Sequence, residues 1–338
     1  MAEISKAFVL NNGISSLIGP KEKGGVDFDS NDTILGVDDA IPIIDYSKLT
    51  SNDPHQSSQA VEFLGKICLE YGFFAVTNHT IPESLINGTM EALQGFFDLA
   101  EEKKRKYETN NAMDKIRWGI GDVQHVTREF FKIVSHPHFH CPTEPNVLRE
   151  TLQEYSKRLR EVGINLVRGI SKSFGQEESY IEKAMSLESG YDFFTANDYP
   201  PRVSAPNIIG QFPHNDPGLL ILLVQNVSGG LQLYHKGKWV KANLNPHWII
   251  VNLADHLEIL TNGKYKSTVH RVIVNNEVRR VTFPLFMGPS LEATVSPAPE
   301  FVDEDNPPAY HGMTYKEYLE ANQHHVIEGK SCLQQIRL

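Results

Sequence analysis

The feature that most constrains this chain is the pattern of its second half. From about residue 185, short apolar runs alternate with turn residues such as Ser228-Gly229-Gly230, Lys236-Gly237 and Asn275-Asn276. Many short strands at roughly even spacing are typical of an antiparallel sandwich or barrel. The chain has 338 residues, 40% of them hydrophobic, and is long enough to build a large core around such a unit. The predicted strands lie in YDFFTANDYPP, NIIGQF, LLILLVQNV, LQLYHKGKWVKA, WIIVNL, KSTVHRVIV and RRVTFPLF.

The first half of the chain is dominated by helical periodicity instead. Apolar residues recur at helical spacing, and two of these stretches end on Gly72 and Gly175, which are typical helix stop signals. Two short apolar runs, AIPIID (40–45) and FFAVTNH (73–79), predict strands. Helices are predicted over 57–71, 83–108 (one long helix or a pair), 150–175 and 310–329.

These changes in pattern predict five segments along the chain. They are an irregular N-terminal arm (1–38), an N-terminal α/β region (39–145), a linking helix (146–184), a β-rich core (185–295) and a C-terminal helical segment (296–338).

Charge and cysteine content narrow the possible partners. The formal net charge is −10 and the one basic run, at 101–108, is flanked by acids, so nucleic acid is not expected as a partner. The three cysteines are far apart and form no CxxC motif, which favours a reducing compartment. Without a signal-peptide layout or a run of about 18 apolar residues, we expect a cytoplasmic protein with no membrane partner. Nothing in the sequence indicates oligomerisation, and a monomer is expected.

The β-rich half contains a possible metal site. In QFPHNDPGLL (211–220), His214 and Asp216 are two residues apart and therefore share one face of a strand. A lone histidine, His270, follows in KSTVHRVIV. Two imidazoles and one carboxylate on a rigid sheet suit non-haem Fe(II) with open positions for oxygen chemistry. A catalytic zinc site can use the same ligands, but its familiar HExxH helix is absent, so iron is favoured without being decided.

A second polar set indicates what would bind beside the metal. Arg280 and Thr282 share a face of the last predicted strand, and a buried guanidinium needs a carboxylate or phosphate partner. The hydroxyls of Thr282 and Tyr199 could hydrogen-bond the same group. A co-substrate with a carboxylate tail that chelates iron at its other end would use all three residues, and 2-oxoglutarate has that shape.

These motifs occur together in a known family. The chain resembles the plant-type 2-oxoglutarate- and Fe(II)-dependent dioxygenases of the isopenicillin N synthase-like superfamily, from about residue 40 to about 325. The motifs that carry the resemblance are HND (214–216), STVHRV (267–272), RVTF (280–283), NDYPP (197–201), SGGLQLYHKGKWVKA (228–242), FMGPS (286–290), IPIIDYSKL (41–49) and YGFFAVTNHTIPE (71–83).

The resemblance implies a fold and a role for each matching residue. The expected fold mixes α and β structure: a distorted double-stranded β-helix, or jelly roll, with flanking helices and an N-terminal α/β segment. His214, Asp216 and His270 would hold Fe(II). The remaining implied positions are Arg280, Thr282 and Tyr199 on the far carboxylate of 2-oxoglutarate, Asn197 near the same chelate, and Thr195 and Phe286 facing the substrate.

Four residues depart from the usual family motifs: Thr80, Asp198, Asn215 and Thr282. A threonine hydroxyl can replace the usual serine at position 282, so co-substrate binding is expected to survive. Asp198 has the opposite parity to its neighbours Asn197 and Tyr199, which predicts that it faces outward. The carboxylate of Asp216 argues against halogenation, because a glycine or alanine there would be needed to admit chloride.

The resemblance also implies an oxidoreductase. It would hydroxylate or oxidatively demethylate a small, mainly apolar plant specialised metabolite, using O₂ and releasing succinate and CO₂, with ascorbate as reductant. The alternatives are a 2-oxoglutarate-independent oxidase of the same superfamily, separated by succinate formation, and a non-catalytic small-ligand-binding barrel, separated by iron binding. A zinc hydrolase would be active without O₂.

Other candidate residues have plainer interpretations. HPHFH (136–140) contains three histidines, but Pro137 breaks any regular ligand spacing, and a loop beside the pocket without metal is predicted. His256 is expected to make a structural hydrogen bond. Phe130 and Phe131 are expected in the core or the pocket wall. Specificity is expected to lie in the N-terminal loops, the 110–146 segment and the C-terminal helix.

Overall fold

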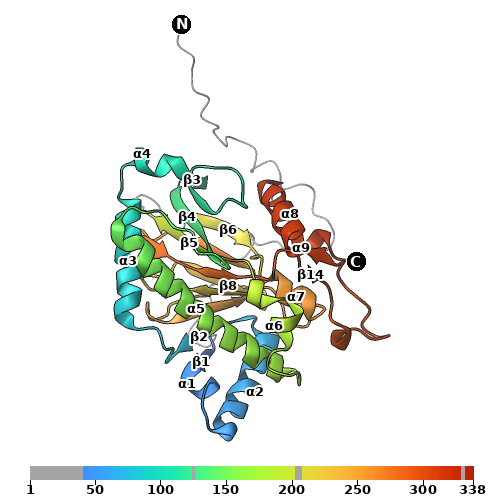
Figure 1. The fold of residues 1–338 in the computed structure, drawn as a ribbon. Coiled ribbons are helices and arrows are strands. Elements are labelled where there is room, and N and C mark those ends of the chain that lie inside the picture. The colour runs from blue at the N-terminus through green and yellow to red at the C-terminus, as the bar shows by residue number, and fades with distance from the viewer. Residues whose placement is uncertain (1–40, 124–125, 202–207, 329–331) are drawn as a thin grey trace.

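The computed structural model describes residues 41–123, 126–201, 208–328 and 332–338 (Figure 1). The predicted N-terminal arm (1–38) lies outside these residues. Helices gather along one face of a stack of strands, and a further helix, α8 (Tyr315–Glu328), lies near the opposite end of the stack (Figure 1).

The larger of two facing sheets combines strands from both halves of the chain. Its order is β1-β2-β10-β7-β13-β5-β4-β3, with β12 also paired to β5. All of its pairings are antiparallel except that of β1 with β2. The bounds are β1 Ile43–Asp45, β2 Phe73–Thr77, β3 Ile116–Val123, β4 Val126–His136, β5 Asp192–Tyr199, β7 Leu220–Leu223, β10 Ile249–Leu253, β12 Arg280–Thr282 and β13 Leu285–Met287.

The smaller sheet has the order β6-β11-β8-β9 and is antiparallel throughout. Together the two sheets form the double-layered core of a jelly roll, in agreement with the predicted fold class. A separate pair, β14 with β15, precedes the C-terminal helix. The bounds are β6 Ile209–His214, β8 Leu231–His235, β9 Lys238–Lys241, β11 His270–Ile273, β14 Thr294–Val295 and β15 Met313–Thr314.

The longest helix, α5 (Asn146–Ser173), covers the outer face of the larger sheet (Figure 1). Its buried stripe includes Leu152, Leu159 and Leu166, spaced seven residues apart as an amphipathic helix requires. Gly163 lies against Met287 of β13, where any Cβ would collide with the Met287 sulfur, so a glycine lets the helix approach the sheet. Helices α2 and α3 pack on α5.

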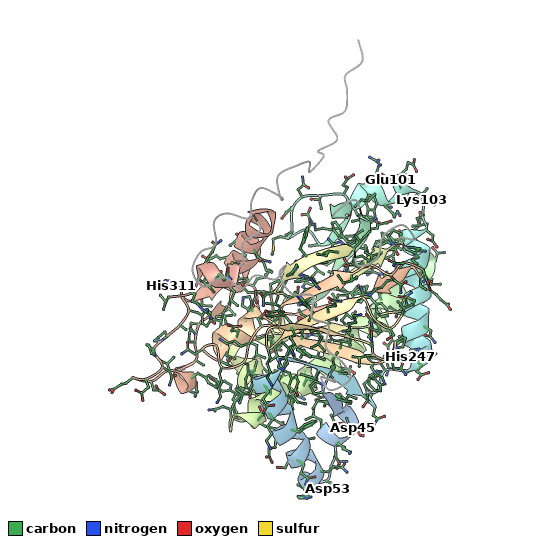
Figure 2. The ribbon with its side chains drawn as sticks, turned by 180° about the vertical axis from the view of Figure 1, so that it is seen from behind. Asp45, Asp53, Glu101, Lys103, His247 and His311 are labelled. Atoms are coloured by element: carbon green, nitrogen blue, oxygen red, sulfur yellow. The ribbon has the colours of Figure 1, made fainter. Side chains whose placement is uncertain are left out.

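The remaining helices are shorter than α5, and α1 and α2 each begin at a capping aspartate. Asp53 caps α2, accepting a hydrogen bond of 3.0 Å from the backbone N–H of His55, and Asp45 caps α1 in the same way (Figure 2). The bounds are α1 Tyr46–Leu49, α2 Pro54–Glu70, α3 Glu83–Phe97, α4 Glu101–Lys104, α6 Tyr180–Ala184, α7 Asp255–Leu260, α9 Cys332–Gln335, and the 3₁₀ turns η2 Arg105–Tyr107, η3 Leu187–Ser189 and η4 Pro299–Phe301.

The glycine stop signals mark real helix ends, whereas one hairpin has no counterpart among the predicted strands. Gly72 and Gly175 follow α2 and α5 with φ of +76° and +81°, the left-handed region that favours glycine. The predicted helix over 83–108 is divided into α3, α4 and η2. The hairpin β3–β4 carries charged side chains at inward positions, and this obscures the apolar alternation by which strands are recognised.

The core is continuous between the larger sheet and the helices. All three thiols, Cys68, Cys141 and Cys332, are free and buried within it. Within the described ranges, no helix combines the length and apolar character needed to cross a bilayer.

Candidate active site

Strand pairing in the smaller sheet brings the predicted metal ligands together. His214 ends β6, His270 begins β11, and the two are direct partners in the antiparallel register. Their ring centroids are 4.2 Å apart. Asp216 follows His214 by two residues, and the ligand atoms of all three side chains lie within 4.8 Å of one another.

The backbone fixes the orientation of both imidazoles. The Nδ1 atoms of His214 and His270 lie 2.7 and 3.1 Å from the carbonyl oxygens of Phe212 and Thr268. A carbonyl oxygen can only accept, so each Nδ1 donates and each Nε2 keeps its lone pair. The two Nε2 atoms face the Asp216 carboxylate at 3.6 and 3.3 Å. Desolvation and the neighbouring His270 ring lower the pKa of His214 to about 4, which leaves a neutral imidazole.

A buried network holds the loop that carries Asp216. The amide of Asn215 donates to the carbonyl and hydroxyl oxygens of Ser267, at 3.1 and 3.0 Å. The Ser267 hydroxyl donates to Asp255 at 2.6 Å, and the backbone N–H of Asp255 donates to the Asp216 carbonyl at 3.0 Å. Burial raises the pKa of Asp255 to about 7. Asn215, a departure from the family motif, thus ties the Asp216 loop to the segment before His270.

A guanidinium with an unused donor lies on β12 of the facing sheet. Arg280 is only 1% exposed, and its Cζ lies 5.5 Å from the centre of the Tyr199 ring. Its Nη2 donates to Gln225 Oε1 at 2.8 Å, and its Nε donates to the Gly229 carbonyl at 3.2 Å. Its Nη1 atom is buried without a hydrogen-bond partner. Burial lowers the pKa of Arg280 to about 10, so the group is still charged at neutral pH. A buried cation with a free donor is built to receive an anion.

The register of β5 places the other predicted site residues around Arg280. Tyr199 pairs with Arg280 and Asn197 with Thr282, so the four side chains share one face. Thr195, two residues further along β5, has the same parity. Phe286 pairs with Phe193 across the neighbouring strand, with stacked rings 4.5 Å apart. The structure therefore groups these predicted positions on one face of the larger sheet.

The opposite face of the same ladder carries the Asp198 departure. Asp198 is 8% exposed, and both of its carboxylate oxygens accept from Arg279 at 2.8 Å. It points away from the face of Asn197 and Tyr199, as predicted, but it is buried by its partner instead of meeting solvent.

Two contributors to the Arg280 environment were missed from the sequence. Gln225, followed by Asn226, ends the apolar part of LLILLVQNV, and an amide directly after a buried strand was the available signal. Gly230 has φ of +81°, and an added Cβ would lie 2.7 Å from Arg280 Cδ and Nε. The Gly229-Gly230 turn therefore permits the close approach of Arg280 as well as the chain reversal.

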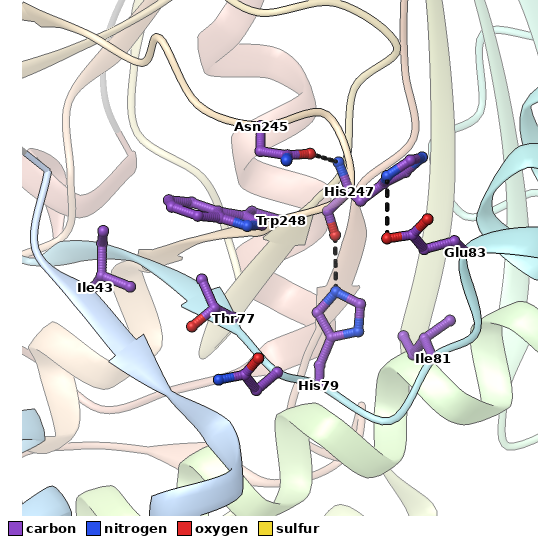
Figure 3. Close-up of a pocket in the computed structure, with 9 residues that line it drawn as sticks. Ile43, Thr77, His79, Ile81, Glu83, Asn245, His247 and Trp248 are labelled. Carbon is purple, nitrogen blue, oxygen red and sulfur yellow. Dashed lines mark hydrogen bonds and ion pairs between the residues drawn. The ribbon is translucent and has the colours of Figure 1, made fainter.

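Two cavities, of about 570 and 770 Å³, are lined by none of the predicted site residues. Figure 3 shows the first, where His79 Nε2 lies 2.8 Å from the His247 carbonyl and His247 faces Glu83 at 3.6 Å. The second is bordered by 135–139 and α5. Among the described residues, the HPHFH histidines take no part in the metal-capable group. His256 makes a structural contact, accepting from the Gly218 N–H at 3.1 Å, as predicted.

Family models match both halves of this chain. Residues 190–289 match the 2OG-Fe(II) oxygenase superfamily, and residues 41–155 match the N-terminal region described as non-haem dioxygenase in morphine synthesis. These two ranges contain the smaller sheet with its three converging side chains and the N-terminal part of the larger sheet.

Individual relatives cover most of the chain. It is 37% identical to 2-oxoglutarate-dependent dioxygenase 19 of Oryza sativa subsp. japonica, over 88% of this chain and 90% of that protein. It is 32% identical to thebaine 6-O-demethylase of Papaver somniferum, over 90% and 87% of the two chains. The crystal structure of JOX2 in complex with 2OG, Fe and JA superposes with a TM-score of 0.74 at 26% identity, covering 92% of both chains.

Proposed function

This chain belongs to the 2OG-Fe(II) oxygenase superfamily and is a 2-oxoglutarate-dependent dioxygenase, and we propose that it hydroxylates or oxidatively demethylates a small, mainly apolar plant specialised metabolite. The convergence of His214, Asp216 and His270 within 4.8 Å carries this proposal. Two Nε2 atoms with free lone pairs and one carboxylate suit Fe(II) and leave coordination positions open. When bound, Fe(II) with 2-oxoglutarate supplies the oxidising power from O₂ for attack on a C–H bond, with release of succinate and CO₂.

The protein's own contribution begins with co-substrate placement. Arg280 would bind the far carboxylate of 2-oxoglutarate through the free Nη1 of its guanidinium group. The hydroxyls of Thr282 and Tyr199 would lie beside the same carboxylate. Asn197 would lie near the chelating end. The unsatisfied Nη1 supports an anionic ligand at this position, because a buried free donor needs an acceptor.

Substrate selection is assigned to the aromatic part of the same face. Thr195 and Phe286 would face the prime substrate, and the stacked pair Phe193–Phe286 offers a flat apolar wall. Relatives of this chain are named for flavanone and leucoanthocyanidin dioxygenation and for thebaine demethylation. These names support a plant specialised metabolite. We further propose that the protein acts as a cytoplasmic monomer with ascorbate as reductant.

Succinate release tests the proposal. The full chain is supplied with Fe(II), 2-oxoglutarate, ascorbate and a panel of plant metabolites under air. His214→Ala is compared with His311→Ala, which changes an exposed histidine that is not part of the ligand group (Figure 2). Succinate should rise with one compound class in the wild type and in His311→Ala, and should vanish in His214→Ala.

The alternatives predict different results in the same assay. Folded, metal-loaded protein that never forms succinate would favour a 2-oxoglutarate-independent oxidase. Failure to bind iron would indicate a binding barrel. Turnover that persists without O₂ would indicate a zinc hydrolase.

A further inference from the structure

The hairpin β3–β4 adds three cations to the face on which the site residues lie. Arg117 of β3 is the direct partner of Lys132 of β4, and Lys132 is in turn the direct partner of Thr195 of β5. Directly paired residues project to the same side of a sheet. Arg128, four residues before Lys132, has the same parity. The proposed substrate wall is therefore lined by positive charge as well as by aromatic rings.

Lys132 is the most buried of these cations. It is 9% exposed, its Nζ donates to the Ala112 carbonyl at 2.7 Å, and the same atom lies 4.2 Å from the centre of the Phe193 ring. Phe193 stacks on Phe286. The Lys132 ammonium group thus lies over Phe193, one of the two stacked rings proposed to contact the substrate.

The two arginines have donors without partners. The Nε atoms of Arg117 and Arg128 are buried and make no hydrogen bond. Both guanidinium groups lie 5.8 Å from the Phe130 ring centre. Arg117 Nη2 donates to the Thr109 carbonyl at 3.3 Å, and Arg128 Nη1 donates to Gln211 of the facing sheet. Neither arginine forms an ion pair with an acidic residue in the part of the chain that the structure describes.

The nearest acidic group is already occupied by other partners. Asp114 attracts both Arg117 and Lys132, but its carboxylate oxygens accept from the Thr109 hydroxyl at 2.6 Å and the Asn111 amide at 2.9 Å. Arg117 and Lys132 against the one carboxylate of Asp114 leave a net single positive charge at this pair. The third cation, Arg128, lies four residues away along β4 and donates to Gln211 of the facing sheet instead. Burial and then the charge of Arg117 lower the pKa of Lys132 to about 7, so the ammonium form of this side chain is disfavoured. A bound anion would relieve both effects.

We infer that the prime substrate carries a carboxylate, bound by Lys132 and Arg117, with its apolar body against Phe193 and Phe286. This inference rests on the proposed function and deepens it. The local charge matches a monoanion such as a carboxylate better than a phosphate ester. The site is separate from that of 2-oxoglutarate, because Lys132 pairs with Thr195 and Arg280 with Tyr199, about 13 Å apart along β5 at ~3.3 Å per residue.

Matched pairs of acid and ester test the inference by binding instead of turnover. The probes are indole-3-acetic acid and 4-phenylbutyric acid, each beside its methyl ester, titrated calorimetrically into the full chain with Fe(II) and saturating 2-oxoglutarate under anaerobic conditions. Each acid should bind about tenfold or more tightly than its ester, the scale of a charge-assisted hydrogen bond. Equal affinity of acid and ester, or no binding of either acid, would overturn the inference.

Charge-removing variants assign the preference to the cation. Lys132→Met keeps an unbranched side chain as far as Cε, removes the ammonium group and should abolish the preference for acid over ester. Lys66→Met is the matched control, since Lys66 is exposed on α2 and paired only with Glu62 at 2.7 Å, and it should keep the full preference. Retention of the preference in Lys132→Met would refute the assignment.

The design separates this inference from the proposed function. If Lys132→Met fails to fold, as circular dichroism would show, the acid–ester comparison in the wild type still decides the matter. Succinate formation is measured independently. Succinate without any acid preference would sink the carboxylate inference alone, and acid preference without succinate would sink the oxygenase proposal alone.

Discussion

Two consecutive arginines, Arg279 and Arg280, lie on opposite faces of one strand pair and differ in how fully their donors are used. Arg279, on the outer face, is saturated: it pairs with Asp198 through two contacts of 2.8 Å and with Asp98 at 2.9 Å. Arg280, on the inner face, has no acidic partner among the described residues and keeps a buried Nη1 free. The charge of Arg279 is satisfied within the protein, whereas Arg280, the residue proposed to bind 2-oxoglutarate, keeps a donor free.

Removal of the Asp216 carboxylate should give the largest loss of activity. Asp216→Gly deletes one of three converging ligand atoms, and hydroxylation should fall below detection while some metal binding survives. Product formation with each substrate class measures the loss. Asp98→Gly removes an exposed outer-face aspartate and should retain activity. Full hydroxylation by Asp216→Gly would show that this carboxylate is not required.

A change at the inner arginine should weaken the co-substrate. Arg280→Lys replaces a planar fork with a point charge that cannot bind a carboxylate through two donors. The apparent Kd for 2-oxoglutarate should rise by about ten- to a hundredfold, the range for a charge-assisted hydrogen bond, measured by anaerobic titration. An unchanged Kd would remove Arg280 from this role.

The Gly229-Gly230 turn, which packs against Arg280, offers a second way to weaken 2-oxoglutarate binding. Gly230→Ala forces a Cβ to within 2.7 Å of Arg280 and into a backbone conformation that suits glycine. We expect a loss of about 1–3 kcal/mol in the free energy of unfolding, together with weaker 2-oxoglutarate binding. Gly237→Ala is the matched control, because Gly237 has φ of +82° but nothing within 4 Å of the added Cβ. Equal 2-oxoglutarate affinity in the two variants would contradict the steric argument.

The smallest effect is expected on the outer face. Arg279→Lys disrupts the paired contacts with Asp198, but the arginine side chain is 32% exposed, so the free energy of unfolding should fall by about 1 kcal/mol or less. Urea denaturation measures that change. The Kd for 2-oxoglutarate should not move. A large rise in that Kd would show that the two faces are coupled and would break the comparison.

The sequence predicted what depends on parity along strands and on turn chemistry. The period of two places Arg280 with Thr282, and glycines mark the ends of α2 and α5. Asp216 lies in the loop after β6, so the buried hydrogen bonds of that loop, and not strand parity, bring it to His214. The family resemblance added the expectation that His270 joins His214 and Asp216. No local pattern specifies the pairing of β6 with β11 that brings the two histidines together.

What escaped prediction depends on partners distant in sequence. The burial of Asp198 follows from Arg279, which lies 81 residues later. Gln225 acquires its role only because Arg280 folds against it. The hairpin β3–β4 was not recognised because Arg128 and Lys132 occupy inward positions where a strand ordinarily shows apolar residues. The division of the chain into five segments stays a prediction, although the larger sheet draws strands from both sides of residue 185.

The carbonyl-anchored imidazoles have a consequence for competition between metals. Hydrogen bonds from Nδ1 to backbone carbonyls hold both rings in place before any ion arrives, so the protein offers a preformed N,N,O set. Among divalent ions such a set follows the Irving–Williams order, in which Cu²⁺ and Zn²⁺ bind more tightly than Fe²⁺. Affinity alone therefore does not select iron, and the supply of free metal in the cell has to contribute. Trace zinc in a purified preparation is expected to occupy the site and inhibit activity, and a chelator should restore that activity.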